Sequence, residues 1–453
     1  MGRWAWGAFS FHCVTGQWAR ARNEGAHRAE GDERQTTIAA ARDSVRRVIA
    51  FEEARTYVLD RVRAGTPVRV PVDDALGLVL AGDVVAPEAV PPFPNTAMDG
   101  FAVRAADTNN APAKLTVVGT LAAGAAPGLA VGPGEAIRIM TGAPMPPGAD
   151  AVIMVELTEY DDSAGIVLVQ QAVSVGNHIR PAGEDLERGS TVFTAGTALT
   201  AGHLGVLASI GEMAPLVYPR PRVGVLSTGD ELIDGPQELA PGQIRDSNRH
   251  TLLALLAQEH CIGVDLGCAP DTEEAITAAL QRGLAQCDAI VTSGGVSMGA
   301  FDYVKVVLDR IGDMLWMQIA IKPAKPLAFG TAGDNESPIF GLPGNPVSSM
   351  VSFELFTRPA LRKMMGYPEQ LWLRRPVRAI ADEAMRRHPD GKVHFNRVIA
   401  EVHDDGRYHL RSAGGQGSHQ LLAMAHANAL AVLPDGDAIG PGEAVDVLLL
   451  ESL

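Results

Sequence analysis

The chain has 453 residues, more than one hydrophobic core usually fills, and a prior of about 150 residues per domain predicts roughly three domains. Its hydrophobic fraction of 46% and charged fraction of 20% exclude a disordered, collagen-like or coiled-coil protein. The net charge of -15 would repel nucleic acid, and no apolar run reaches the roughly 20 residues of a membrane-spanning helix, so neither nucleic acid nor a membrane is an expected partner.

The N-terminal part of the chain divides into an extension and a β-rich region. Residues 1–45 show no periodic pattern and no signal peptide, so we expect a mobile extension on a cytoplasmic protein. Apolar side chains then recur at helical spacing over residues 50–63 and predict an amphipathic helix. Short β-type runs between Pro and Gly turns follow, and we predict a β-rich region over residues 46–218, with a subdomain of about 92–185 inserted in a second one.

The pattern changes at residue 219. Strand candidates at 223–226, 289–292 and 338–342 alternate with helical stretches at 251–259, 273–285, 303–311 and 348–358. This alternation predicts a doubly wound α/β domain over residues 219–366, with a mostly parallel sheet and helices on both faces. Short strands and turns over residues 367–453 predict a small C-terminal β domain.

Three loops follow strands of the predicted α/β domain, at the edge where ligands bind in such sheets. Their candidate binding residues are Ser227, Thr228 and Gly229, then Ser293, Gly294, Gly295 and Ser297, then Pro343, Gly344, Asn345 and Pro346. Glycine lets backbone N–H groups approach a phosphate, and a following helix directs its positive N-terminus at the ligand. The loops match neither a dinucleotide fingerprint nor a P-loop, and an ordinary strand-to-helix turn is the alternative for each.

Charged residues near these loops suggest an anion site and a metal site. Lys322 and Lys325 lie on a proline-stiffened segment and would suit a phosphate or small oxyanion, although solvated surface lysines are the alternative. Asp230, Asp246 and Asp271 could hold Mg²⁺, which prefers one or two carboxylates together with phosphate oxygens and water. Asp246 and Asp271 also precede predicted helices, where capping is an equal or stronger alternative.

Three further polar residues stand in the N-terminal half. Asp99 is followed by a turn glycine, Thr141 ends an apolar run, and Glu184 belongs to a short acidic cluster. Taken alone, Asp99 and Thr141 could serve only in turn chemistry, and the acidic cluster of Glu184 is typical of a solvated loop.

Read together, these strings resemble one family, the molybdopterin molybdenumtransferases, called MoeA in bacteria and related to the gephyrin E domain. The resemblance covers about residues 48–450 and is carried in order by NTAMDGFAV, RIMTGAPMPPGAD, RPAGED, VLSTGDEL, IRDSN, TSGGVSMGAFDYVK, IKPAKP, GLPGNPVSS and GGQGSH. It implies a transferase of molybdenum cofactor biosynthesis that inserts molybdate into adenylated molybdopterin, releases AMP and uses Mg²⁺ or another divalent cation.

The resemblance also implies roles for single residues. Lys322, Lys325, Arg397 and Ser418 match the site for molybdate and the cofactor anion, and Pro343 and Pro346 would shape its wall. Asp99, Thr141, Glu184, Asp246 and Asp271 match residues that the family uses for turnover. The family further implies a homodimer whose active cleft lies between the α/β domain of one subunit and the N-terminal region of its partner.

Two positions depart from the family pattern, and two other functions compete with molybdenum insertion. Ala324 and Val398 stand where the family usually has Gly, and residues before 46 lie outside the match. Related adenylyltransferases share the α/β domain, so adenylation of molybdopterin by a nucleoside triphosphate is one alternative. A non-enzymatic scaffold, as in the gephyrin relative, is the other, and the intact acids and lysines disfavour it.

Overall fold

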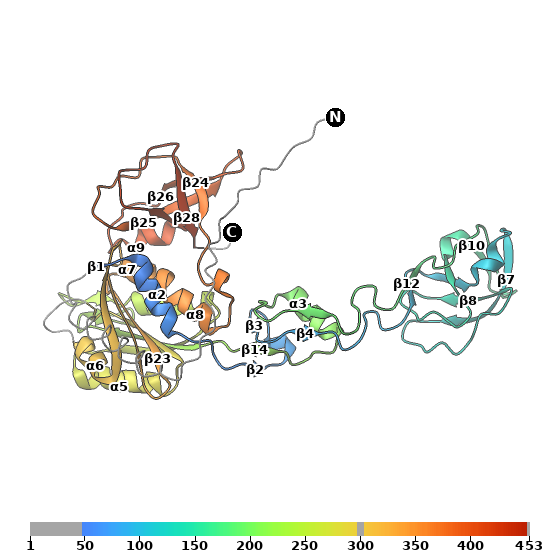
Figure 1. Cartoon of the computed structure of the whole chain (residues 1–453), viewed down its shortest axis with the longest axis horizontal. Coiled ribbons are helices and arrows are strands. Elements are labelled where there is room, and N and C mark those ends of the chain that lie inside the picture. Colours follow the sequence, from blue (N-terminus) through green and yellow to red (C-terminus); the bar gives the residue numbers. More distant parts are fainter. Residues whose placement is uncertain (1–47, 297–302, 451–453) are drawn as a thin grey trace, which may run out of the picture. The chain divides into compact units, whose positions relative to one another are not determined.

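A computed structural model of the chain describes residues 48–296 and 303–450 (Figure 1). The predicted extension of residues 1–45 and the predicted site residue Ser297 lie outside these described residues. Within the described ranges, no helix is both long enough and apolar enough to cross a membrane.

The first described helix belongs by its packing to the α/β domain. Helix α2 (Phe51–Arg61) has nearly the bounds that its periodicity predicts. Its buried residues Ala54 and Val58 join the core that also contains the helices and strands of the α/β domain. Lys363 Nζ also donates a hydrogen bond of 2.8 Å to the carbonyl of Leu59. The helix that opens the N-terminal region in sequence therefore covers the α/β domain.

Short antiparallel pairings follow α2. They are the sheet β2 (Val68–Arg69), β14 (Leu216–Tyr218) and β3 (Val79–Leu80), the pair β4 (Val84–Val85) with β13 (Thr191–Phe193), and the pair β5 (Asn95–Thr96) with β12 (Ile179–Arg180). Helix α3 (Ala201–Ser209) packs on the first sheet through Leu207. The outgoing strands β4 and β5 pair with the returning strands β13 and β12, so the chain between them leaves and returns through these pairings. The inserted subdomain of about 92–185 stays a prediction.

The inserted chain forms a six-stranded sheet. Its order is β10 (Thr158–Asp161), β11 (Ile166–Val169), β7 (Ala113–Leu121), β8 (Glu135–Ile139), β6 (Gly100–Val103) and β9 (Ala151–Met154). Both faces are covered, because Phe101 and Val103 join one apolar core and Ala102 joins another. A side chain at Gly100 would overlap the carbonyl of Ile153 on the neighbouring strand, so this strand must begin with glycine immediately after Asp99.

The α/β domain is built on a mixed sheet. From one edge the strands are β18 (Ile262–Ala269), β15 (Arg222–Thr228), β19 (Ala289–Ser293), β23 (Ser337–Leu342), β22 (Pro326–Ala332) and β20 (Gly312–Ile319), with Ile49 of β1 (Val48–Ile49) beside β20. The first four strands are parallel to one another, as predicted, whereas β22 runs antiparallel to both of its neighbours, β23 and β20. The connection between β20 and β22 is too short for the crossover that parallel strands need, which explains the antiparallel pairing. The doubly wound prediction is thus confirmed, with an antiparallel edge in addition.

Helices cover both faces of this sheet (Figure 1). Helices α5 (Glu273–Leu284) and α6 (Tyr303–Ile311) bury Leu280 and Leu308 against one face. Helices α4 (Asn248–Gln258), α7 (Pro346–Ser352) and α8 (Arg358–Met364) pack with α2 on the other face. The single helix predicted over 348–358 is longer and irregular, because a π-helical turn (Phe353–Thr357) joins α7 to α8.

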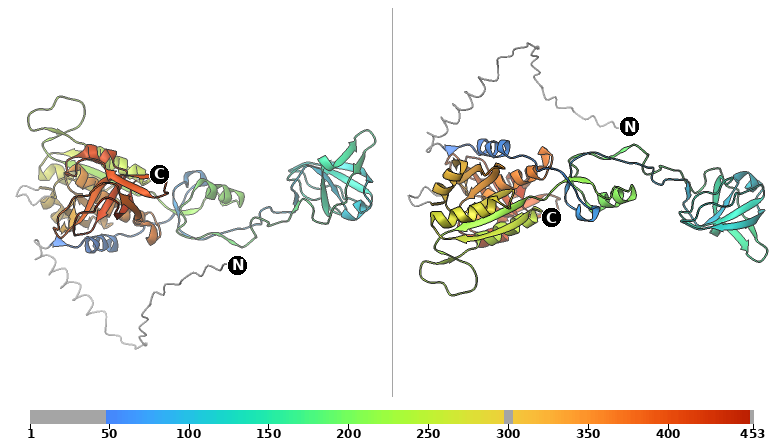
Figure 2. Two further views of the ribbon diagram at one scale, coloured as in Figure 1. Left: turned by 90° about the horizontal axis from the view of Figure 1, so that it is seen from above. Right: turned by 90° about the horizontal axis from the view of Figure 1, so that it is seen from below.

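The C-terminal β domain closes on itself (orange to red in Figures 1 and 2). Its strands are β25 (Val393–Val402), β26 (Tyr408–Ser412), β24 (Val377–Ala381), β28 (Ala444–Leu449) and β27 (Ala429–Leu433), and β27 pairs again with β25. Because the pairing of β27 with β25 closes the ring, none of the five strands has a free edge. A short strand of the α/β domain, β21 (Ile321–Lys322), joins β25 in parallel, and helix α9 (Leu421–His426) packs nearby on β25.

Candidate active site

The predicted glycine loops meet at one edge of the α/β sheet. Strands β15, β19 and β23 are parallel neighbours, and the three loops follow their carboxyl ends. Gly294 lies between the other two loops, since a Cβ placed on it would be 3.1 Å from the carbonyl oxygen of Thr228, and one placed on Gly344 would be 3.7 Å from Gly294 Cα. Ser227, Thr228 and Ser293 are buried beneath them. The structure thus brings together the loops that the sequence places at the ligand-binding edge.

Two of the loop glycines are required by backbone geometry and packing. Gly294 and Gly295 have φ values of +96° and +70°, which side chains rarely adopt. A side chain at Gly295 would also overlap Val304 of helix α6. Gly295 therefore allows close packing of α6, whereas Gly344 is exposed, and a Cβ on it would make only ordinary contact with Gly294. The contribution of each glycine to ligand approach stays a prediction.

Asn248, the first residue of helix α4, connects two of these loops, and sequence reasoning missed it. Its Nδ2 donates to Ser293 Oγ at 2.8 Å and to the carbonyl of Gly344 at 2.7 Å. These two bonds fix the distance between the loop after β19 and the loop after β23. The signal available in the sequence was Asp-Ser-Asn at a helix start, which equally suggests capping.

Asn345 and Pro346 stand at the start of helix α7. Asn345 occupies the N-cap position and Pro346 the first helical turn, but the Asn345 side chain makes no capping hydrogen bond. The side chain is exposed beside Gly344. The Asn345 amide is therefore not used for capping and is available at the loop surface.

Arg397 is the unusual charge of this region. It lies on β25, its exposed fraction is 0%, and no carboxylate pairs with it in the described residues. Its Nη2 donates to the carbonyls of Gly415 and Gly417 at 2.7 and 3.2 Å, while Nε and Nη1 have no hydrogen-bond partner there. Burial lowers the pKa of Arg397 because nothing nearby compensates its charge. A buried guanidinium with two unused donors is prepared to receive an anion.

The loop that contains Ser418 joins Arg397 to the glycine loops. Gln416 fixes this loop on β25, since its Oε1 accepts from the Arg397 backbone N–H at 2.9 Å. The Ser418 carbonyl accepts a 3.1 Å hydrogen bond from the N–H of Val347, in the first turn of α7. Arg397 and Ser418 are thus adjacent to the loop of Gly344 and Pro346, although they are far apart in sequence.

Lys322 and Lys325 are exposed at the turn between β20 and β22. Lys322 pairs with His394 on β25, three residues before Arg397, so the segment runs beside the strand of the buried arginine. Between the lysines, Ala324 is 2% exposed and has a φ of +71°. That conformation explains why the resemblance predicts Gly at this position, and Ala324 holds it under backbone strain.

Asp230 and Asp271 are in direct contact beside the loop of Ser227. Asp230 Oδ1 accepts the Asp271 N–H at 3.0 Å. Burial raises the pKa of Asp271, and the negative charges of Asp230 and Glu231 raise it further. A bound cation would relieve this repulsion. The observed N-cap of helix α5 is the neighbouring Thr272, whose hydroxyl accepts from Ala275 N–H, so the capping alternative for Asp271 is wrong.

Asp246 is occupied by protein partners. It is 4% exposed, its Oδ2 is 3.0 Å from Arg249 Nε, and its Oδ1 accepts from Ser227 Oγ and the Arg249 N–H at 3.1 and 3.2 Å. Arg249 also pairs with Asp234 and Asp265. Asp246 thus orients the start of α4 beneath the loop of Ser227, and its predicted metal role stays a prediction.

In the N-terminal half, Asp99 and Thr141 form a pair of their own. Asp99 Oδ1 accepts from the Thr141 hydroxyl at 2.7 Å and from the Thr141 N–H at 2.6 Å. These two bonds, the hydroxyl first, lower the pKa of Asp99. Glu184 is exposed, in a loop whose backbone closes toward Pro181 at 3.4 Å. The structure thus brings Asp99 and Thr141 into direct contact, and their role in turnover stays a prediction.

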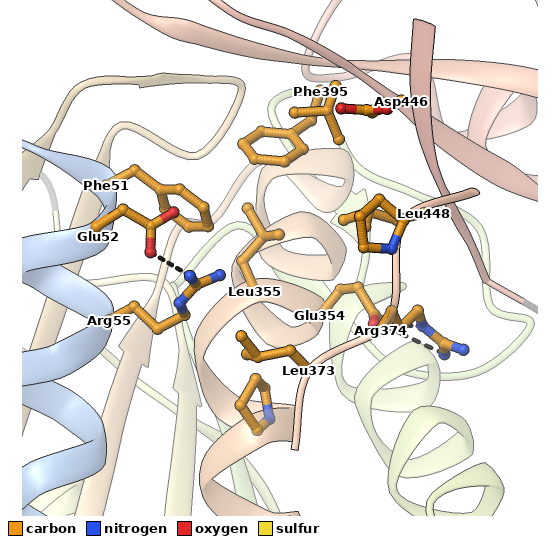
Figure 3. A pocket seen from close by; sticks show the side chains of 13 residues that line it. Phe51, Glu52, Arg55, Glu354, Leu355, Leu373, Arg374, Phe395, Asp446 and Leu448 are labelled. Atoms are coloured by element: carbon orange, nitrogen blue, oxygen red, sulfur yellow. Dashed lines mark hydrogen bonds and ion pairs between the residues drawn. The ribbon is translucent and has the colours of Figure 1, made fainter. Parts of the chain in front are cut away.

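A separate pocket of about 270 Å³ opens beside α2 (Figure 3). Phe51, Leu355, Phe395 and Leu448 supply much of its apolar lining. Its charged groups are already paired, as Figure 3 shows for Arg55 with Glu52 and for Arg374 with Glu354. None of its lining residues is a predicted site residue. We therefore place the candidate active site at the glycine loops and Arg397.

Comparison with protein families covers nearly all of the described chain. Residues 49–211 match the MoeA N-terminal region (domain I and II), residues 224–363 match the probable molybdopterin binding domain, and residues 378–450 match the MoeA C-terminal region (domain IV). The second match contains the glycine loops, and the third contains Arg397 and Ser418.

Curated relatives and solved structures agree with these matches. The chain is 41% identical over 396 residues to molybdopterin molybdenumtransferase 2 of Mycobacterium tuberculosis, which covers 85% of this chain and 95% of the relative. It is 37% identical over 405 residues to molybdopterin molybdenumtransferase of Haemophilus influenzae, covering 88% and 98%. The crystal structure of a molybdopterin biosynthesis MoeA protein from Pyrococcus horikoshii has a TM-score of 0.75 at 29% identity, covering 90% of this chain and 100% of that one. The chain belongs to the molybdopterin molybdenumtransferase family, known as MoeA.

Proposed function

We propose that this protein inserts molybdenum from molybdate into adenylated molybdopterin, with release of AMP, as a transferase of molybdenum cofactor biosynthesis. The single observation that carries the proposal is Arg397, a buried cation with two unused donors beside the glycine loops. An unpaired buried charge is costly to the free protein, and an oxyanion would compensate it. The relatives named molybdopterin molybdenumtransferase favour molybdate as that oxyanion.

The two substrates would occupy neighbouring parts of the site. The glycine loops, tied together by Asn248, would receive the phosphates of the pterin substrate through backbone N–H groups. Lys322, Lys325 and Arg397, with the Ser418 hydroxyl, would receive the molybdate dianion. Local cations are needed here, because the net charge of -15 opposes the approach of any anion. The site would thus hold the organic substrate and the oxyanion side by side for transfer.

We also propose a divalent cation, with Mg²⁺ as the expected ion. Asp230 and Asp271 would hold it, because burial and then the negative charge of Asp230 raise the pKa of Asp271, and a cation between the two carboxylates would offset both effects. When bound, such an ion would neutralise charge on the phosphate oxygens of the adenylate. Asp246 would keep Arg249 and Ser227 in place, and would bind the ion only if its pair with Arg249 opened.

Asp99, Thr141 and Glu184 would act at the active cleft of a second subunit. We propose a cytoplasmic homodimer in which the loop of Asp99 contributes to the active cleft of the partner, with the Thr141 hydroxyl and N–H holding the Asp99 carboxylate in position. A monomeric variant that kept full activity would contradict this arrangement.

The direct test is incubation with adenylated molybdopterin, molybdate and Mg²⁺, following AMP release and protein-bound molybdenum together. We expect both products from the native chain and a large loss of both in Lys325→Ala and in Asp99→Ala. A parallel incubation with unadenylated molybdopterin and ATP serves as the control. Robust pyrophosphate release in that control would assign the adenylation step instead, and absence of both products from the native chain would favour a non-enzymatic scaffold. Unchanged turnover in both variants would contradict the roles proposed for Lys325 and Asp99.

A further inference from the structure

The C-terminal β domain carries a second cluster of ligand atoms, far in sequence from the glycine loops. Asp382 follows β24, His403 follows β25, and His409 lies on β26. Strands β24 and β26 are parallel neighbours that pair Ile380 with His409, and the Asp382 N–H donates to the carbonyl of Leu410 at 2.9 Å. Three strands of the barrel therefore present these side chains at one place.

The ligand atoms of the cluster are close together. One ligand atom each from Asp382, His403 and His409 lies within 4.8 Å of the others. His409 Nδ1 is 2.6 Å from Asp382 Oδ1. The rings of His403 and His409 are stacked, with centroids 4.1 Å apart and an interplanar angle of 1°. Among the described residues, no other group of three or more His, Cys, Asp or Glu side chains meets this spacing.

We propose that Asp382, His403 and His409 bind one divalent transition-metal ion of the Zn²⁺ class, with water in the fourth position. Two imidazoles and a carboxylate are ligands that Zn²⁺ takes in proteins. The same donors bind Mg²⁺ poorly, because Mg²⁺ prefers oxygen ligands in octahedral geometry. This ion is independent of the Mg²⁺ proposed at Asp230 and Asp271, and it does not depend on the proposed transferase activity.

Asp405 supplies the outer support that metal-bound histidines usually have. Its Oδ2 lies 3.3 Å from His409 Nε2, on the opposite side of the ring from Asp382. We assign Nδ1 of His409 to the metal, because it faces Asp382, and Nε2–H to Asp405. A carboxylate that accepts the second ring N–H fixes the tautomer and orientation of a ligating histidine.

Metal binding requires one ring to turn. A metal lies in the plane of each imidazole that binds it, so two stacked parallel rings cannot share one ion in the present arrangement. Tetrahedral Zn²⁺ separates its ligand atoms by about 3.3 Å, shorter than the limit of 4.8 Å found here. His403 and Asp382 are exposed, and both can move without disturbing the barrel core. The free protein thus holds the ligands near one another, and the ion would draw them together.

The bound ion would connect three strand ends of the barrel. His403 opens the turn between β25 and β26, which closes through hydrogen bonds from His403 N–H to Arg407 O at 3.0 Å and from Gly406 N–H to His403 O at 2.9 Å. Asp382 directly follows β24, which is the parallel neighbour of β26. An ion shared by these residues would slow opening of this turn, which amide hydrogen exchange can measure.

The test uses the full chain without an affinity tag, stripped with chelator and held in excess Mg²⁺. Zn²⁺ is titrated by calorimetry, and Co²⁺ by its visible absorption. We expect one Zn²⁺ per chain, tetrahedral Co²⁺ bands without a thiolate band, and slower exchange in the turn of residues 403–407. His403→Gln and Asp382→Asn should each lower the affinity for Zn²⁺ at least about tenfold. Both should leave the fold intact, because both side chains are exposed.

His250→Gln is the matched control. His250 is an exposed histidine whose Nε2 lies 3.0 Å from Asp234 Oδ1, but no second histidine joins it in a group of metal-ligand spacing. Zn²⁺ affinity should be the same in His250→Gln as in the native chain. Absence of saturable Zn²⁺ binding in the native chain, or equal affinity in the His403→Gln and Asp382→Asn variants, would overturn the proposal.

Discussion

Replacing Arg397 by Met tests the buried guanidinium, because Met keeps much of the side-chain volume without the charge. Two opposed effects act on the free energy of unfolding. The hydrogen bonds to the carbonyls of Gly415 and Gly417 are lost, at about 1.5–3 kcal/mol each. The desolvation of an unpaired guanidinium, several kcal/mol, is relieved at the same time. We therefore expect the free energy of unfolding without ligand to change by less than about 2 kcal/mol.

Anion binding should change much more than stability in Arg397→Met. Loss of one partner of a buried, hydrogen-bonded charge pair costs about 2–5 kcal/mol. This corresponds to a Kd for molybdate that rises from about 30-fold to several thousand-fold. Calorimetric titration with molybdate measures the Kd, and urea unfolding of the same protein measures stability.

Arg387→Met is the matched control for Arg397→Met. Arg387 is a buried arginine of the same domain, but its guanidinium donates to Leu433 O at 2.7 Å, to Lys392 O at 3.1 Å and to Asp435 Oδ1 at 2.9 Å. We expect Arg387→Met to lower the free energy of unfolding without raising the Kd for molybdate. An unchanged Kd in Arg397→Met would show that its guanidinium does not reach the anion, and a large loss of stability would show that it is structural.

Three further substitutions test local features of the site. Thr141→Val should raise the pKa of Asp99 toward the ordinary value of about 3.9, so that Asp99 loses its charge at a higher pH, whereas Thr141→Ser should not; an NMR titration of the carboxyl checks both. Gly295→Ala should destabilise the α/β domain by about 1–3 kcal/mol, and Val304→Ala in the same chain should recover part of the loss if overlap is the cause, as urea unfolding will show. Ala324→Gly should stabilise the chain by about 1 kcal/mol in thermal unfolding, and a loss would mean that its positive φ carries no strain.

The parts of the fold that were predicted depend on local pattern. Helix α6 (Tyr303–Ile311) has the predicted bounds, because its apolar residues recur at helical spacing and pack on one face of the sheet. The parallel order of β15, β19 and β23 follows from their alternation with helices. The antiparallel edge was missed, because the turn between β20 and β22 carries the lysine motif and gives no hairpin signal of its own.

The parts of the site that were not predicted depend on contacts between distant residues. The family resemblance indicated Arg397, but no local pattern indicates that it is fully buried without a counter-ion. Asn248 and Gly344 are 96 residues apart, and only the fold brings them to one hydrogen bond. The capping alternative for Asp271 failed for a local reason, since the hydroxyl of Thr272 was one residue closer to the helix.

The pairing of β21 with β25 has a consequence for dividing the molecule. Lys322 belongs in sequence to the α/β domain, but its strand pairs with β25 of the C-terminal barrel, three residues before Arg397. A truncation that removed the barrel would leave this short strand without its neighbour and would separate the two cations. Chimeras that exchange C-terminal barrels between relatives should therefore exchange residues 320–326 together with the barrel, because the two segments form one recombination unit.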